Sequence, residues 1–220
     1  MARMKNGPYG PIVGKLGNTV GYIRLGQPVI RMIKHPATKP ATPKQEAARA
    51  RLRLVSGYIK TINYFTNISF KPFSRNFIGK TAQNMAISAN LHSAVAGEYP
   101  DYVLDGSKLI LSRGGMPLPE QCTVELAGEN LRFSWLGGEE IGFPYSTEQV
   151  MMLAYFPESG RSVYLAGGAR RTAGEDFLAL QAGFNDTGTA ETYVEAYIAF
   201  VSNDRTAVSD SLYLGPVALI

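Results

Sequence analysis

Short runs of alternating apolar and polar residues fill the chain from Tyr102 onward, and this pattern admits few folds. In the longest run, Val194, Ala196, Ile198 and Phe200 share one face of a strand, while the residues between them share the other. Glycines and polar turn residues separate the runs, which favours an antiparallel sandwich. The runs expected to form strands are 102–105, 107–113, 121–126, 130–136, 148–156, 161–166, 176–181, 191–202 and 206–214.

Two helices are expected before these strands. Thr42, Pro43 and Gln45 have the arrangement of a capping box with proline at the first helical position. Apolar residues then recur every three or four positions, which predicts an amphipathic helix over 43–66. Small apolar residues at similar spacing predict a second helix over 81–95.

The beginning of the chain is rich in glycine and basic residues. Residues 1–18 predict a mobile or docking arm of turns, because Gly14-Lys15 lacks the earlier glycine and the following hydroxyl residue of a phosphate-binding loop. Two β-branched runs at 19–24 and 29–34 predict a hairpin, with a glycine in the turn between them.

Charge is distributed unevenly along the chain, whose net charge is +4. Residues 1–80 contain fifteen Lys and Arg and one acid, whereas residues 81–220 contain seven Lys and Arg and seventeen acids. Halves of opposite charge attract each other, attract neighbouring copies, or leave the basic half to bind a polyanion. The expected fold is therefore α+β, with a basic region of arm, hairpin and helices over 1–98 and an acidic immunoglobulin-like β-sandwich over 99–220.

The residue content argues against catalysis. One cysteine, Cys122, and two histidines leave little material for a metal cluster or a Ser-His-Asp triad, and no cofactor is expected. The adjacent carboxylates at 139–140 and 175–176 are expected to face solvent rather than each other across a cleft. No secretory leader and no apolar run of bilayer-spanning length is visible, so a cytoplasmic location is expected.

The later part of the chain, over residues 120–216, resembles a fibronectin type III or immunoglobulin-like module. Trp135 resembles the core tryptophan of an early strand, and the run from Val150 to Tyr155 resembles its neighbour. Residues 193–201 and 209–213 resemble the final hairpin of such a module. The resemblance implies the sandwich architecture, and sandwiches of this kind serve many functions.

The whole chain also resembles an uncharacterised family of bacterial proteins, mostly from Bacteroidetes. The residues that carry this resemblance are GKLGNTVGY at 14–22, Arg31, Thr42 and Gln45 before Arg49, Tyr99-Pro100, LSRG at 111–114 and SDSLYLG at 209–215. The resemblance implies no activity and no catalytic residues.

We predict a non-enzymatic structural or protein-interaction module that uses its basic region as the contact surface. The partner would be another protein or a second copy of the chain, and nucleic acid is the alternative. A carbohydrate bound by the sandwich loops near Phe143 and Tyr145 is a further alternative. The residues predicted to make the contact are Lys15, Arg24, Arg31, Arg49, Arg53 and Lys60.

Overall fold

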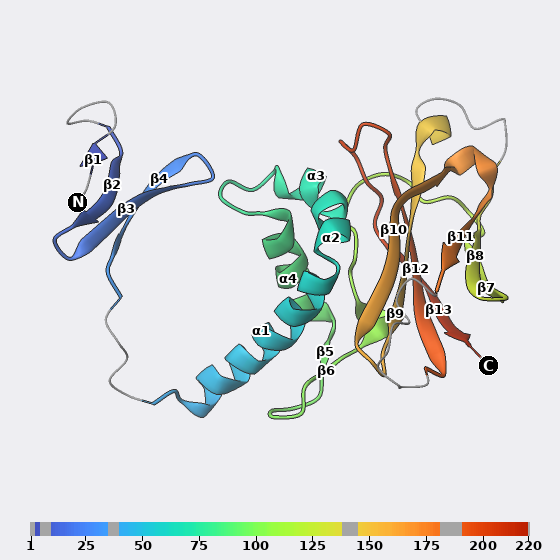
Figure 1. The fold of residues 1–220 in the computed structure, drawn as a ribbon, viewed down its shortest axis with the longest axis horizontal. Coiled ribbons are helices and arrows are strands. Elements are labelled where there is room, and N and C mark those ends of the chain that lie inside the picture. Colours follow the sequence, from blue (N-terminus) through green and yellow to red (C-terminus); the bar gives the residue numbers. More distant parts are fainter. Residues whose placement is uncertain (1–2, 5–9, 35–39, 138–144, 181–190, 220) are drawn as a thin grey trace. The chain divides into compact units, whose positions relative to one another are not determined.

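The structure is a computed structural model that describes residues 3–4, 10–34, 40–137, 145–180 and 191–219 (Figure 1). The chain forms two compact units, Met1–Pro43 and Lys44–Ile220. We call them the small unit and the large unit, and each is considered by itself.

The small unit is a four-stranded antiparallel sheet. Its strands follow one another in the order β1 (Arg3–Met4), β2 (Ile12–Leu16), β3 (Thr19–Arg24) and β4 (Gln27–Met32). The predicted hairpin is confirmed, and Leu25 and Gly26 both adopt positive φ, at 48° and 79°, in its two-residue turn. The prediction of an arm without strands over 1–18 is wrong, because β2 pairs with β3 and extends the sheet.

Two glycines allow β2 to cross the sheet closely. Gly14 has a φ of 116°, and it pairs with Gly21 of β3. A Cβ atom on Gly21 would lie 2.1 Å from the carbonyl oxygen of Ile12, so no side chain fits there. The β2 strand therefore folds over β3 at Gly21, the one residue of β3 that is buried.

Gly21→Ala is expected to detach β2 from β3 without unfolding the large unit. Amide hydrogen exchange followed by mass spectrometry should show faster exchange over residues 12–24 and unchanged exchange in the strands of the large unit. Gly57→Ala is the matched control, because nothing lies within 4 Å of a Cβ atom there and alanine is the better helix former by about 0.5 to 1 kcal/mol. Unchanged exchange over residues 12–24 in Gly21→Ala would show that the close crossing is not formed.

The large unit begins with helices. They are α1 (Pro43–Thr61), α2 (Asn63–Ser69), α3 (Lys71–Ser74) and α4 (Ala82–Ser93). One continuous helix over 43–66 was expected, but α1 ends at Thr61, where the Thr61 hydroxyl donates to the Tyr58 carbonyl at 2.7 Å. Threonine hydroxyls that bond to nearby carbonyls compete with the helical backbone. The second expected helix is confirmed as α4, whose N-cap Thr81 accepts a hydrogen bond from the Asn84 amide.

The strands of the large unit form antiparallel sheets, as expected. The four-stranded sheet has the order β10 (Arg161–Arg170), β9 (Gln149–Phe156), β12 (Tyr193–Val201) and β13 (Leu212–Ala218). The three-stranded sheet has the order β11 (Glu175–Ala179), β8 (Asn130–Ser134) and β7 (Thr123–Ala127). A short pair joins β5 (Val95–Ala96) to β6 (Val103–Leu104), and 3-10 turns lie at Gly106–Lys108, Tyr145–Thr147 and Arg171–Ala173.

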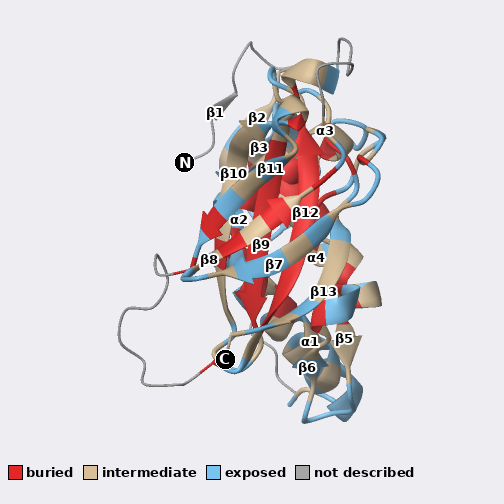
Figure 2. Ribbon diagram, turned by 90° about the vertical axis from the view of Figure 1, so that its right-hand side faces the viewer, coloured by how far each residue is buried: buried red, intermediate tan, exposed pale blue. Residues whose placement is uncertain are grey.

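The inner strands of the four-stranded sheet, β9 and β12, are buried on both faces (Figure 2). In β12, Val194, Ala196, Ile198 and Phe200 pack toward the three-stranded sheet, as the alternation predicted. The intervening side chains, including Tyr197, pack into a second core shared with α1, α2 and α4. The compact units divide at Pro43, whereas the regions expected from the sequence divide at residue 98, because the helices belong to the core of the sandwich.

The strand expected over 107–113 is absent, and side chains satisfy its backbone instead. The Asn90 amide group forms two hydrogen bonds of 2.8 Å with the carbonyl and N–H of Ile110. The Ser69 hydroxyl donates to the Leu111 carbonyl at 2.6 Å. These bonds hold the segment against α2 and α4, which places Leu109 and Leu111 in the helix-side core.

Candidate interaction surface

Three of the six predicted contact residues lie on one face of the small sheet. Val20 of β3 pairs with Lys15 of β2 on one side and Arg31 of β4 on the other, so the three share a face. Alternate residues of a strand point the same way, which adds Tyr22 and Arg24 to this face. Lys15, Arg24 and Arg31 are exposed. We call the side of the sheet that carries these three residues the basic face.

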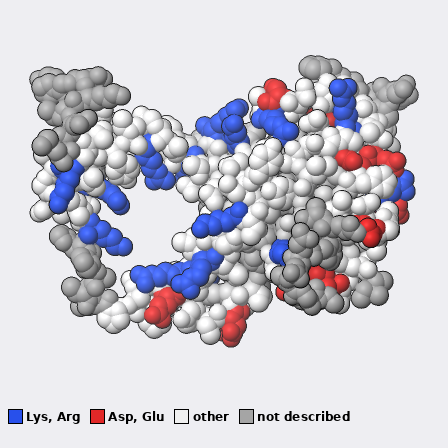
Figure 3. All heavy atoms as spheres, viewed as in Figure 1, with Lys and Arg blue, Asp and Glu red and all other residues white. Residues whose placement is uncertain are grey.

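No acidic residue of the small unit balances the positive charge of the basic face. Residues 1–43 contain seven Lys and Arg and no Asp or Glu. Within the described part of the chain, no carboxylate pairs with Lys15, Arg24 or Arg31. The Arg31 guanidinium lies 5.7 Å from the centroid of the Tyr22 ring. This contact holds the Arg31 side chain along the surface of the sheet. The small unit in Figure 3 accordingly shows blue side chains and no red ones.

The other three predicted residues lie on α1, in the large unit. Arg49 and Arg53 are exposed and one helical turn apart, and Lys60 is exposed two turns further on. Burial in α1 begins only at Val55, so the first turns of the helix expose both arginines. The six predicted residues thus form two separate basic groups. One is on the small sheet and the other is on α1.

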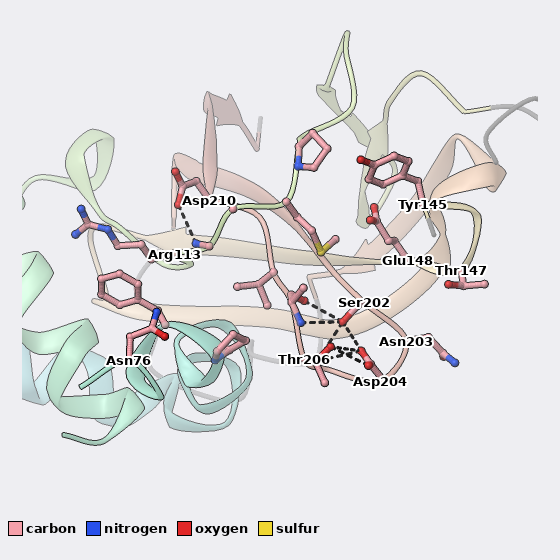
Figure 4. A pocket seen from close by; sticks show the side chains of 18 residues that line it. Asn76, Arg113, Tyr145, Thr147, Glu148, Ser202, Asn203, Asp204, Thr206 and Asp210 are labelled. Carbon is pink, nitrogen blue, oxygen red and sulfur yellow. Dashed lines mark hydrogen bonds between the residues drawn. The ribbon is translucent and has the colours of Figure 1, made fainter. Parts of the chain in front are cut away.

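The large unit also has a groove that sequence analysis missed (Figure 4). It has a volume of about 980 Å³ and lies where the β12–β13 loop meets the segment 113–117 and the 3-10 turn at Tyr145–Thr147. Its lining includes the apolar side chains of Met116, Pro117 and Val208 together with polar side chains. The size and mixed lining are typical of small-ligand sites.

A buried ion pair supports one wall of this groove. The Arg171 guanidinium donates to Glu148 at 2.7 Å and to the Pro117 carbonyl at 2.9 Å, and both Arg171 and Glu148 are buried. The same guanidinium lies over the rings of Tyr145 and Phe200, at 5.2 and 5.6 Å from their centroids. Burial raises the pKa of Glu148, and the hydrogen bond and charge of Arg171 oppose that rise. This pair fixes the positions of the groove residues Tyr145, Glu148 and Pro117.

The remaining carboxylates of the groove are already held by their neighbours. Asp204 accepts hydrogen bonds from the hydroxyls of Ser202 and Thr206, which lower its pKa to about 2. Asp210 accepts from the amide of Gly114 at 3.0 Å. Figure 4 shows Asp204 with Ser202 and Thr206, and Asp210 near Arg113. Each acid therefore has a local structural role.

Of the adjacent carboxylates singled out in the sequence, those at 175–176 lie apart from the groove. Glu175 pairs with Arg132 on the exposed side of the three-stranded sheet, where Arg132 also pairs with Glu125. Asp176 accepts from the amide of Ala169 at 2.7 Å. The other pair, at 139–140, lies outside the described residues.

Cys122, the histidines and the loop aromatics complete the list of predicted candidates. Cys122 is half-buried, and burial raises its pKa. Among the described residues, no group of three or more His, Cys, Asp or Glu side chains has the arrangement of a metal site. Tyr145 lines the groove, with one ring face against Arg171. Phe143 and His35 lie outside the described residues.

These observations define the class of protein: an α+β chain with a charged antiparallel sheet followed by a helix-covered β-sandwich. The chain belongs to a family of unknown function (DUF6266), whose model matches residues 11–215. The resemblance to an uncharacterised family is thereby confirmed, and the match takes in every element from β2 to β12. A source among Bacteroidetes stays a prediction. Comparison with curated proteins and with solved structures gave no match.

Proposed function

We propose that this chain is a non-enzymatic interaction protein that contacts an acidic protein surface through the basic face of its small sheet. The observation that carries the proposal is the basic face itself, with Lys15, Arg24 and Arg31 exposed side by side in a unit that has no acid. Concentrated charge of one sign steers association with surfaces of the opposite sign.

The large unit supplies an acidic surface of its own. The large unit as a whole contains eighteen acids and fifteen Lys and Arg, but its part over 81–220 contains seventeen acids and only seven Lys and Arg, so this part of a neighbouring copy offers a surface of the opposite charge. In Figure 3, red side chains gather over the three-stranded sheet, where Glu125 and Glu175 flank Arg132. Contact between the basic face of one copy and the acidic part of the large unit of the next would produce head-to-tail association.

The sandwich supports the same kind of role. Counted along the chain from β7, the first, second and fifth strands form one sheet. The third, fourth, sixth and seventh strands form the other. Trp135 lies between the sheets, 5.4 Å from Phe200 and edge-on to it. Both features support the relation to fibronectin type III modules, which we carry forward as part of the proposal.

None of the helices in the described part of the chain has the length and hydropathy that crossing a bilayer requires.

Salt-dependent mass tests the proposal. Static light scattering of the full chain is expected to show association at about 50 mM salt that disappears at about 500 mM, because salt screens exposed charges. The triple variant K15E/R24E/R31E is expected to remain monomeric at both concentrations. The control K71E/R75E/K80E makes the same change in net charge at exposed residues of the large unit and is expected to associate like the parent.

Nucleic acid is the second candidate, and the stacking of Arg31 on Tyr22 favours it. A gel-shift assay with generic duplex DNA and single-stranded RNA separates the candidates. Binding through the three basic side chains would weaken with salt with a log–log slope of about −3. A chain that is monomeric at low salt and also shifts neither nucleic acid would contradict the assignment of the basic face as a contact surface.

A further inference from the structure

β4 is the last strand of the small sheet, and its outer edge pairs with no other strand of the described chain (Figure 1). The Ile33 amide donates to the Asn18 carbonyl at 2.8 Å, so odd-numbered residues of this strand bond toward β3. Inward and outward positions alternate in an antiparallel pair, so Ile30 and Met32 direct their N–H and C=O groups outward. Pro28, which has no N–H, occupies another outward position. The free edge of β4 therefore offers the complete backbone groups of two residues.

β7 is the last strand on one side of the three-stranded sheet in the large unit. The Trp135 amide donates to the Gly174 carbonyl on the β11 side at 2.8 Å, so even-numbered residues of β8 bond toward β7. Those residues lie opposite the odd-numbered residues of β7. Val124 and Leu126 consequently direct their backbone groups away from β8. Each unit thus has one free strand edge.

The side chains of the two edges follow the same pattern as their backbone groups. On β4 the two outward residues are apolar and flank Arg31, whose side chain lies on the basic face. On β7 the two outward residues are also apolar and flank Glu125, whose exposed side chain lies beside Arg132. Arg132 pairs with both Glu125 and Glu175, so one guanidinium serves two carboxylates. A second cation beside Glu125 would balance the charge.

Antiparallel alignment of the two edges satisfies both patterns at once. Outward residues then lie opposite each other and share a face, which places apolar against apolar. The opposed apolar pairs are Ile30 with Leu126 and Met32 with Val124. Arg31 then lies directly opposite Glu125, with the Cα atoms about 4.5 Å apart as in other pairs of this kind. Parallel alignment would instead set outward residues opposite inward ones, and so an apolar side chain beside Glu125.

We propose that β4 of one copy adds to the free edge of β7 in a neighbouring copy as an antiparallel strand, with Arg31 opposite Glu125. This pairing rests on the proposed function and deepens it, since it names the strand that the acidic part of the large unit receives. Pairing β4 with β4 of another copy would set cations beside cations, because the small unit contains no acid. Two hydrogen-bonded pairs and one exposed ion pair make a weak contact, so association depends on protein concentration and weakens with salt.

Disulfide cross-linking at about 50 mM salt tests the pairing and its register. Cys122→Ser removes the single native cysteine, and separate chains then receive one cysteine each on β4 or β7. The alignment places Val29 opposite Ala127 and Ile33 opposite Thr123, at a Cα separation that suits a disulfide. None of these substitutions changes a charge.

Oxidised mixtures of two chains are expected to give heterodimers only for matched positions. Val29→Cys with Ala127→Cys, and Ile33→Cys with Thr123→Cys, should cross-link in a yield that rises with protein concentration. The crossed mixtures, Val29→Cys with Thr123→Cys and Ile33→Cys with Ala127→Cys, are the matched controls. They should give at least tenfold less heterodimer, because those positions are four residues, or about 13 Å, out of register.

A proline tests the backbone hydrogen bonds directly. β3 does not use the N–H of Ile30, so Ile30→Pro removes only the donor directed at β7. Added to the Ile33→Cys chain, it is expected to lower the yield of the heterodimer with Thr123→Cys at least tenfold. An unchanged yield would overturn the addition of a strand.

The remaining outcomes are distinct from one another. Equal or greater cross-linking in the crossed mixtures would overturn the antiparallel register. A chain with both Val29→Cys and Ala127→Cys that forms only an internal disulfide, with no heterodimer in the mixture, would overturn the contact between copies. No cross-linking in any mixture would overturn the pairing of β4 with β7, and the salt-dependent mass of the parent chain then decides the proposed function by itself.

Discussion

Replacing Arg171 by methionine is expected to destabilise the large unit by about 3 to 5 kcal/mol. The change leaves the buried carboxylate of Glu148 without the guanidinium that lies 2.7 Å from it. It also removes the hydrogen bond to the Pro117 carbonyl and the contacts with Tyr145 and Phe200. Urea unfolding measures the loss, and a thermal scan should show a shift of about 10 °C for a unit of this size.

The double variant Glu148→Met/Arg171→Met is the control for this prediction. Removing both charges leaves no buried ion unpaired, so most of the lost stability is expected to return. The pH dependence provides a second check. Without Arg171, burial alone raises the pKa of Glu148, so the folded state holds its proton more tightly than the unfolded state does. The deficit of Arg171→Met should therefore shrink as the pH falls through that raised pKa, and a deficit equal in the double variant would contradict the account.

Phe65→Ala is expected to cost about 3 to 5 kcal/mol as well, since it removes a large side chain from a packed core. Phe65 is 1% exposed and meets Tyr164 of β10 edge-on, with ring centroids 5.7 Å apart. Tyr64→Ala is the matched control, because that neighbouring ring is 62% exposed and its loss should change stability by about 0.5 kcal/mol or less.

The Phe65→Ala variant also tests whether the helices and the sandwich form one folding unit. If the helices formed a unit separate from the sandwich, Phe65→Ala would leave the unfolding of the sandwich unchanged. Because α2 and β10 share one core, we expect a single transition, followed by the fluorescence of Trp135 and by helical circular dichroism, to shift as a whole. Two transitions that move independently in Phe65→Ala would contradict the shared core.

Local patterns predicted the strands well where each strand's own residues determine its structure. The hairpin of β3 and β4 follows from β-branched runs around a glycine turn, and β12 follows from strict alternation. The run from Val150 to Phe156 contains no charged residue, which is typical of a strand buried on both faces, and the helices indeed cover it. That signal could have placed the helices on the sheet.

The features that sequence reasoning missed depend on distant partners. Arg171 and Glu148 lie next to the last pair of the β9–β10 hairpin, and the register of that hairpin shifts after Ala166, so simple counting along the two strands does not bring them together. Asn90 replaces a strand partner for Ile110 through its side chain, which no periodicity predicts. The basic residues of the small sheet were correctly singled out by composition. That they share one face follows only from the register of β2, and the glycine-rich sequence had not predicted a strand there.

The central claim is that the small sheet is the surface by which copies or partners meet. Amide hydrogen exchange of the full chain, measured at low and high protein concentration in low salt, tests it most directly. The account predicts that exchange over residues 12–32 slows as concentration rises, while the inner strands β9 and β12 are unchanged. Slowing confined to the large unit, with residues 12–32 exchanging at the same rate throughout, would contradict it.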